Sequence, residues 1–344
     1  MTEPVRWGVL GCARVFERRM VPGFRAAADS AQLLAVASRS DEKAREVAAK
    51  HGIARAYGSY KSLLADPDIE AVYIPLPNDL HCAWTLRALA AGKHVLCDKP
   101  VALSVADAEA MATAAKTANL RLQEGFMYRH HPQHERVWEI VRGGEIGEQV
   151  HFRGAFAYVA NFDASNIRMN TAQGGGAFLD VGVYPLNAAR WFFGEPVAIT
   201  AAQRTDPTTG IDLHTTVLME WADGKTATIL GGFDQPFTTR YEIIGTGGSV
   251  TTERAFQVGD NGVSLTIRAG DTERAEPFAH ADQYGLEIAH FSACVRDPDK
   301  PLAPGENGLA QARVAEAAGV SVREKRRVTI SEVEISGGHC VIGA

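Results

Sequence analysis

The sequence predicts an α/β protein in which a doubly wound parallel sheet is followed by an α+β domain with an open, mainly antiparallel sheet. In the first third of the chain, short apolar runs alternate with alanine-rich amphipathic stretches, a pattern typical of repeated βαβ units. Between residues 198 and 278, period-two runs are joined by turn signals such as the glycines around position 247. We therefore predict one domain over residues 1–125, a second over 126–330 and a C-terminal tail over 331–344.

The first domain is predicted to contain five short strands separated by helices. Ser40 and Ser104 each precede a helical pattern, where a side-chain oxygen can cap the first turn. The predicted strands are 5–10, 32–37, 71–74, 94–97 and 121–124. The predicted helices are 18–28, 41–50, 60–65, 80–91 and 105–118.

After Gly125 the alternation changes, which is why the domain boundary is predicted there. The second domain is predicted to start with a helix, a strand and another helix after a run of three glycines. Helical periodicity returns late in the chain, before a last strand. The predicted elements are 133–142, 149–159, a helix after 174–176, 284–295, 306–323 and 327–335.

The composition is that of an ordinary globular protein, and it excludes several functional classes. The chain has 344 residues, 46% hydrophobic and 22% charged, so two domains with a sizeable core are expected. A net charge of -6 with scattered basic residues gives no footprint for nucleic acid. Five cysteines without a Cys-x-x-Cys pair suggest neither a disulfide framework nor a thiolate zinc site. Because we also find no leader pattern and no apolar run of membrane-spanning length, we expect a cytoplasmic protein.

A glycine turn after the first predicted strand is a candidate nucleotide site. The residues Gly11, Cys12, Ala13 and Arg14 stand between that strand and a helix, where backbone N–H groups can hold a pyrophosphate. The dinucleotide fingerprint is imperfect, because Ala13 and Phe16 replace its second and third glycines. A plain strand-to-helix turn therefore remains the alternative at this position.

The end of the second predicted strand favours NADP over NAD. An acidic residue at this point would accept from the ribose hydroxyl of NAD, whereas this chain has Ser38 and Arg39. A hydroxyl and a guanidinium suit a 2′-phosphate. The alternative is that Arg39 is a solvated loop residue, and Asp41, the nearest acid, is expected to start the next helix.

Four motifs follow one another along the chain: the segment 77–81, Asp98-Lys99-Pro100, the segment 125–129 and the segment 174–184 that contains Asp180 and Tyr184. Together they resemble the glucose-fructose oxidoreductase / inositol dehydrogenase / rhizopine-catabolism (Gfo/Idh/MocA) family. The resemblance covers about residues 5–325. It implies an N-terminal Rossmann domain and an α+β domain whose open sheet makes a homodimer or homotetramer.

Two departures from the family's usual pattern affect the chemistry. Asp98 replaces a glutamate, which should leave the role of Lys99 intact. Tyr184 stands where many members have histidine. A tyrosine there resembles the branch with glucose-fructose oxidoreductase, aldose and xylose dehydrogenases, dihydrodiol dehydrogenases and some nucleotide-sugar ketoreductases.

The resemblance implies a catalytic group of Lys99, Asp180 and Tyr184. A neighbouring ammonium lowers the pKa of a tyrosine from about 10, so Tyr184 would act as general acid or base. Lys99 would also hydrogen-bond the reacting oxygen, and Asp180 would orient a sugar hydroxyl. The alternatives are purely structural roles: Tyr184 as a core aromatic, Lys99 in a surface turn and Asp180 as a helix cap.

The resemblance also implies residues that line the cofactor and the substrate. Beside the glycine turn, those along the cofactor are Pro75, Leu76, Asn78, His81, Asp98 and Lys99, with a helix N-cap as the alternative for Asn78. Those bordering the substrate are Arg129, Tyr158, Arg168, Asp180 and Tyr184. For the first three, the alternative is a structural contact between the domains. Near His130, His131 and His134, no Asp, Glu or Cys other than Glu135 could complete a ligand set, so no metal is expected.

The function implied is hydride transfer between NADP and a sugar or polyol carbon, as in aldose and xylose dehydrogenases. The runner-up is a trans-dihydrodiol dehydrogenase or a nucleotide-ketosugar reductase. A non-catalytic NADP-binding regulator is the alternative from another class. An enzyme that keeps its nucleotide and is reset by a second sugar also stays open.

Overall fold

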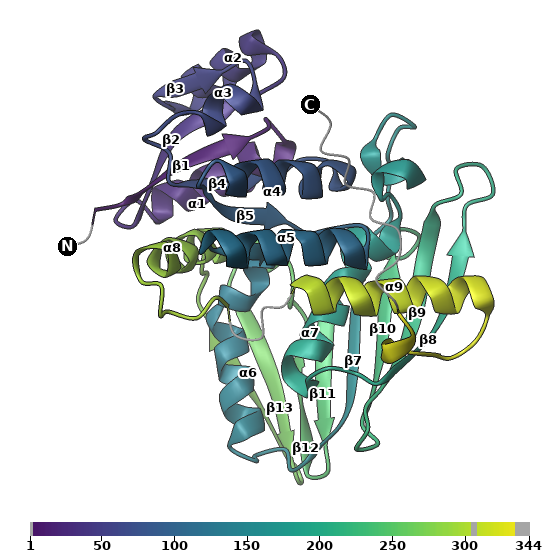
Figure 1. The fold of residues 1–344 in the computed structure, drawn as a ribbon. Helices are drawn as coiled ribbons and strands as arrows, with labels where there is room; N and C mark the ends of the chain where they lie inside the picture. Colours follow the sequence, from purple (N-terminus) through teal and green to yellow (C-terminus); the bar gives the residue numbers. More distant parts are fainter. Residues whose placement is uncertain (1–2, 304–307, 334–344) are drawn as a thin grey trace. The chain divides into compact units, whose positions relative to one another are not determined.

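The chain forms two compact units, each with its own sheet (Figure 1). This computed structural model describes residues 3–303 and 308–333. The first unit runs to His130 and takes in a later stretch that begins at Asp282. The second unit runs from His131 to Ala281 and resumes at Ala310. Among the described residues, each unit thus includes two separate parts of the chain, whereas the sequence prediction used continuous domains.

The sheet of the first unit is parallel and has the order β3-β2-β1-β4-β5-β6. The order reverses between β1 and β4, which is the topological switch point of a Rossmann fold. The predicted fold class is confirmed, although strand β3 was not predicted. The strands are β1 (Val5–Leu10), β2 (Ala31–Ala37), β3 (Arg55–Tyr57), β4 (Ala71–Ile74), β5 (His94–Asp98) and β6 (Leu122–Gly125).

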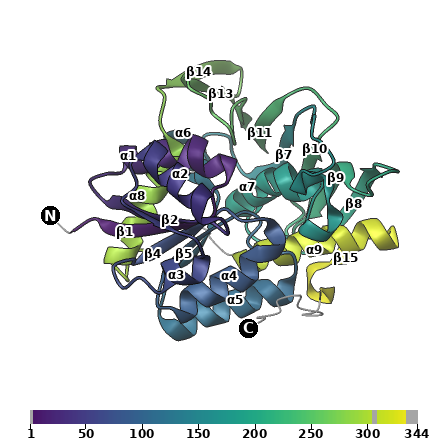
Figure 2. The same cartoon turned by 90° about the horizontal axis from the view of Figure 1, so that it is seen from above.

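Helices connect these strands on both faces of the sheet (Figure 2). Ser40 and Ser104 cap α2 and α5 as predicted, since their side chains accept from Lys43 N–H and Asp107 N–H. The first helical segment is a π turn, η1, continued by α1. The helical segments are η1 (Phe16–Met20), α1 (Val21–Ala26), α2 (Asp41–His51), α3 (Tyr60–Leu64), η2 (Asn78–Leu80), α4 (His81–Ala90), α5 (Val105–Ala118) and η3 (Met127–His130).

One helix from late in the chain, α8 (Gln283–Arg296), completes the core of the first unit. Trp7 of β1 is fully buried between Phe24 and Phe291, with ring centroids 5.5 and 5.4 Å away. Its indole N–H donates to Ser292 Oγ at 3.1 Å. Burial of these aromatic rings stabilises the unit and explains why α8 belongs to it rather than to the second unit.

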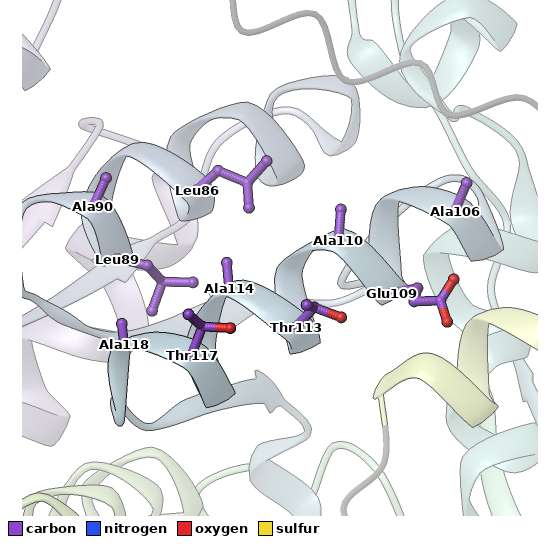
Figure 3. A pocket seen from close by; sticks show the side chains of 10 residues that line it. All are labelled: Leu86, Leu89, Ala90, Ala106, Glu109, Ala110, Thr113, Ala114, Thr117 and Ala118. Carbon is purple, nitrogen blue, oxygen red and sulfur yellow. The ribbon is translucent and has the colours of Figure 1, made fainter.

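A shallow groove runs between α4 and α5 on the surface of the first unit (Figure 3). Small side chains line much of it, because alanines and threonines of α5 face leucines of α4. No predicted site residue lies in this groove, and we assign it no role. None of the helices in the described part of the chain is both long and apolar enough to span a membrane.

The sheet of the second unit is mixed and mainly antiparallel, in the order β14-β13-β12-β11-β7-β10-β9-β8-β15. Strands β7 and β10 run parallel, so the connections after both meet at one edge of the sheet. That edge positions the candidate substrate residues described below. The strands are β7 (Gln149–Ala157), β8 (Ala198–Thr205), β9 (Asp212–Glu220), β10 (Thr226–Gly232), β11 (Thr238–Gly245), β12 (Gly248–Thr252), β13 (Val263–Ala269), β14 (Thr272–Phe278) and β15 (Val328–Thr329).

Three longer helices accompany this sheet: α6 (Pro132–Arg142), α7 (Val183–Phe193) and α9 (Gly308–Glu324). The last predicted strand is short, because β15 gives way to the helical turn η7 (Ile330–Glu332). Positions 334–344, and with them Cys340 and most of the predicted tail, lie outside the described residues.

A buried histidine ties α6 to the sheet. His134 Nδ1 lies 2.7 Å from the Tyr241 hydroxyl, and its Nε2 lies 3.0 Å from the Ala255 carbonyl oxygen. The carbonyl can only accept, so Nε2 carries the proton and Nδ1 accepts from the tyrosine. Burial lowers the pKa of His134 to about 3, because desolvation disfavours the imidazolium.

We expect the free energy of unfolding to fall as the pH drops from 7 to 5. The pKa of His134 is lower in the folded protein than in the unfolded chain, so its stabilisation is present above about pH 6.5 and is lost below it. The loss should be about 2 kcal/mol for one fully buried histidine at pH 5. Urea unfolding of the wild type and of His134→Gln at both pH values measures it. An equally steep pH dependence in the variant would contradict this assignment.

Candidate functional site

The candidate nucleotide residues gather at the carboxyl edge of the first unit's sheet. Gly11, directly after β1, has φ +117°, and its N–H donates to the Ala37 carbonyl of β2 at 2.9 Å. A Cβ there would lie 2.9 Å from Leu76 Cδ2, in the segment after β4. Only glycine suits this conformation and this close approach. The chain therefore makes a side-chain-free turn before a helix, which fits the approach of a pyrophosphate.

The turn after β2 adds polar and cationic groups to this edge. Ser40 N–H donates to Ser38 Oγ at 3.2 Å, while the Ser40 side chain caps α2. Burial raises the pKa of Tyr60, and the positive charge of Arg39 acts in the opposite direction. These groups fit the phosphate and ribose of NADP, since hydroxyl and guanidinium groups both donate to phosphate oxygens.

Two residues near this turn were missed by the sequence reasoning. Lys43, on the first turn of α2, is close enough for its charge to act on the Cys12 thiol. Burial is the larger effect and raises the pKa of Cys12, so this thiol stays protonated. Tyr60 lies with its hydroxyl 3.8 Å from the position of a Cβ on Gly11. The position of Lys43 one turn after the Ser40 cap could have revealed it, whereas nothing in the sequence pattern singled out Tyr60.

Lys99 follows β5 at the same edge, and its neighbours are held by specific contacts. Its backbone N–H donates to Asp98 Oδ1 at 3.1 Å, and the Tyr73 hydroxyl lies 3.4 Å from Asp98 Oδ2. The Lys99–Pro100 peptide bond is cis. The Val101 N–H donates to Glu124 Oε1 at 2.8 Å. These contacts fix the backbone on both sides of the lysine.

His81 links the loops that follow β4 and β5. Its ring is fully buried, with Nε2 2.8 Å from the Leu76 carbonyl and Nδ1 2.8 Å from the Pro100 carbonyl. Asn78 begins the short helix η2 and is not its cap, because Pro77 holds that position. Arg129 is buried in η3 and belongs to the first unit, whereas the other predicted substrate residues belong to the second.

Three predicted substrate residues do come together in the second unit. Asp180 Oδ2 accepts from the Tyr158 hydroxyl at 2.8 Å and from Arg168 Nε at 2.9 Å. Tyr158 follows β7, and Arg168 lies in the short helix η4 (Ile167–Met169). Burial and the charge of Asp180 raise the pKa of Tyr158 well above its ordinary value, so this phenol stays a proton donor to the carboxylate.

Asp180 lies inside a π turn, η6 (Phe178–Gly182), which leads directly into α7. The alternative that it caps a helix is wrong, since Ala177 holds the cap position. Tyr184 is the second residue of α7, one helical turn beyond Asp180. A π turn places residues i and i+4 on almost the same face, and such turns often occur at functional sites.

The ring of Tyr184 packs in an aromatic cluster at this edge of the second sheet. Its centroid lies 5.4 Å from that of Phe156 and 5.8 Å from that of Phe256, and 7% of the residue is exposed. These contacts fix the ring and exclude water from its sides.

Asp212, at the start of β9, anchors the beginning of the same helix. Its Oδ2 accepts from Phe178 N–H at 2.6 Å and from the Thr215 hydroxyl at 3.0 Å. Gly176, with φ +111°, lets the carboxylate approach, because a Cβ there would lie 1.9 Å from Asp212 Oδ1. Sequence reasoning missed Asp212, since it is distant in the chain from the helix it holds.

Comparison with known proteins identifies the family. Residues 5–126 match the family described as "Oxidoreductase family, NAD-binding Rossmann fold", and residues 134–251 match the "GFO/IDH/MocA C-terminal domain". The chain belongs to the Gfo/Idh/MocA oxidoreductase family. The predicted family, the oxidoreductase class and a nicotinamide cofactor are thereby confirmed.

Similar curated proteins include two enzymes that act on different sugars. The chain is 35% identical to D-xylose 1-dehydrogenase (NADP(+)) 2 of Haloferax volcanii, over 90% of this chain and 95% of that one. It is 36% identical to dTDP-3,4-didehydro-2,6-dideoxy-alpha-D-glucose 3-reductase of Saccharopolyspora spinosa, over 94% and 99%.

Similar solved structures cover nearly the whole chain. A 3-ketoreductase from Actinomadura kijaniata, in complex with NADP and TDP-benzene, has a TM-score of 0.87 and 32% identity over 93% of this chain and 98% of that one. The aldose-aldose oxidoreductase from Caulobacter crescentus has a TM-score of 0.88 and 30% identity over 95% and 100%.

Proposed function

We propose that the protein transfers hydride between NADP and a carbon of a sugar or polyol, with Tyr184 as general acid or base assisted by Lys99. The observation that carries the proposal is the helix start that fixes Asp180 and Tyr184 one turn apart, with Asp180 already bonded to Tyr158 and Arg168. A carboxylate, a phenol and a guanidinium together suit a polyhydroxylated substrate. The resemblance of the chain to sugar dehydrogenases and reductases supports this reading.

The chain's own residues would handle the proton and the negative charge. Bound nicotinamide would supply or accept the hydride. Tyr184 would donate its phenolic proton to the oxygen of a carbonyl being reduced, and would take the proton back from an alcohol being oxidised. The ammonium of Lys99 would stabilise the negative charge that develops on that oxygen. Asp180 would orient the substrate by accepting from one of its hydroxyls.

NADP is the proposed cofactor, with Ser38, Arg39 and Lys43 around its 2′-phosphate. We expect Arg39→Gln to raise the KM for NADP about tenfold, because a charged hydrogen bond is lost, and to leave the KM for NAD unchanged. The control is Arg45→Gln, an exposed α2 arginine that pairs with Asp41 at 2.6 Å. An equal rise for both nucleotides in Arg39→Gln would contradict binding to the 2′-phosphate.

A nucleotide-ketosugar reductase is the second candidate, favoured by the likeness to 3-reductases of that class. A dihydrodiol dehydrogenase is supported by a 31% identical relative from Bos taurus over 71% of the chain. Nicotinamide absorbance, followed with NADP or NAD against aldoses, inositols, ketosugars and trans-dihydrodiols, separates these activities. Bound nucleotide without turnover on any of them would point to a retained cofactor or to a regulator.

The cellular setting and assembly are also proposals. We expect a cytoplasmic protein that forms a homodimer or homotetramer through the sheet of its second unit. Burial alternates along β9, and Leu218 on that strand is 38% exposed. Such a half-exposed sheet face suits association with a second copy. Light scattering of the purified protein measures the oligomeric state.

A further inference from the structure

The guanidinium of Arg254 packs over the exposed aromatic ring of Phe237. Arg254 follows β12, and its guanidinium carbon lies 5.1 Å from the centroid of the Phe237 ring. Phe237 is 46% exposed and contacts Phe156, with centroids 6.4 Å apart. Phe156 in turn contacts Tyr184. Three successive contacts, through the rings of Phe237 and Phe156, therefore connect Arg254 to the proposed general acid or base within the second unit.

The backbone that carries Arg254 is fixed by buried polar groups. Its carbonyl oxygen accepts from Gln133 Nε2 at 2.9 Å, and Gln133 Oε1 accepts from the Thr252 hydroxyl at 2.9 Å. On the other side, Ala255 N–H donates to the Thr239 carbonyl at 2.6 Å. Gln133, Thr252 and Thr239 are all buried. A cation on such a fixed backbone loses less conformational freedom when it binds a ligand.

The hydrogen-bond donors of Arg254 are not used by a carboxylate of the described chain. Stacking on Phe237 occupies the face of the guanidinium and leaves its N–H groups, which lie in the plane, able to donate outward. Two other arginines of the second unit differ in this respect, since Arg168 pairs with Asp180 at 2.9 Å and Arg240 pairs with Glu253 at 3.5 Å. Arg254 therefore carries a positive charge that no carboxylate of the described residues compensates, and the rings of Phe237 and Phe156 lie between it and Tyr184.

We infer that Arg254 is a specificity-determining residue that binds a phosphoryl group carried by the sugar substrate. The inference rests on the proposed function, because that function places the sugar at Tyr184. The planar fork of a guanidinium matches two phosphate oxygens at once. A neutral sugar would leave this cation without a partner. The phosphoryl group can belong to a sugar phosphate or to a nucleoside diphosphate sugar.

Calorimetric titration of the full-length protein tests this inference. Saturating NADPH fills the nucleotide site, so that the probes report on the substrate residues. The probes are glucose 1-phosphate against methyl glucoside, and dTDP against thymidine. In each pair we expect the anion to bind at least tenfold more tightly than its uncharged partner, with an affinity that falls as salt rises. The pair that shows this difference tells which source the phosphoryl group has.

The variants are Arg254→Gln, Arg254→Lys and the control Arg240→Gln. Arg254→Gln should reduce the anion's affinity about tenfold and remove its salt dependence. Arg254→Lys should restore part of the affinity, and Arg240→Gln should match the wild type. Equal binding of charged and uncharged probes, or an equal effect of Arg240→Gln, overturns the inference. So does a wild-type kcat/KM for a neutral sugar equal to that for its phosphorylated form, an outcome that leaves the proposed function standing. Tight anion binding without turnover on any sugar would instead contradict the proposed function alone.

Discussion

Tyr184→Phe is expected to lower kcat by about 10² to 10⁴-fold, because general acid–base catalysis contributes about that much. The KM for the sugar should change little, since the phenylalanine keeps the ring that packs against Phe156 and Phe256. Binding of NADPH, measured by its fluorescence, should be close to that of the wild type. Full turnover in the variant would remove Tyr184 from the mechanism.

Tyr158→Phe is the matched control, because it deletes the same hydroxyl from a neighbouring tyrosine. Tyr158 donates to Asp180 and its raised pKa keeps it protonated, so it cannot serve as the base. Its loss loosens the carboxylate that would hold the substrate. We therefore expect Tyr158→Phe to raise KM more than it lowers kcat, the opposite of Tyr184→Phe. Similar kinetics in the two variants would mean that neither hydroxyl has a special role in proton transfer.

Much of the first unit could be predicted because its strands are continuous apolar runs bounded by turns. The predicted limits of β1, β4 and α5 coincide with the observed ones. Strand β3 was missed, since its three residues are only partly buried and show no period. The sequence also did not predict that α8 belongs to the first unit, because the apolar face of a helix does not indicate which sheet it packs against.

The candidate site was predictable where its residues are close in sequence. The four-residue spacing indicated that Asp180 and Tyr184 share a face, and in the structure Asp180 lies in the π turn η6 and Tyr184 in the helix α7 that directly follows it. The role of Asp212 could not be predicted from the sequence, because the start of β9 and the helix it anchors come together only in the folded structure. Residues that act through folding contacts leave no local pattern.

Lys99→Met is expected to lower kcat by about 10² to 10³-fold, the usual cost of removing one group that stabilises developing negative charge. Methionine keeps an unbranched side chain of similar length, without the ammonium. The backbone contacts on either side, from Asp98 and Glu124, involve main-chain N–H groups and survive the change. NADPH binding and the midpoint of thermal unfolding should therefore remain near the wild-type values.

The pH profile of alcohol oxidation by Lys99→Met separates the two roles proposed for this lysine. If the ammonium favours the phenolate of Tyr184, its removal makes the proton harder to release, and the rising limb of kcat should move to higher pH. A lower kcat with an unmoved limb would mean that Lys99 stabilises the reacting oxygen without acting on the tyrosine. Turnover equal to that of the wild type at every pH would exclude both roles, since neither can survive the loss of the charge.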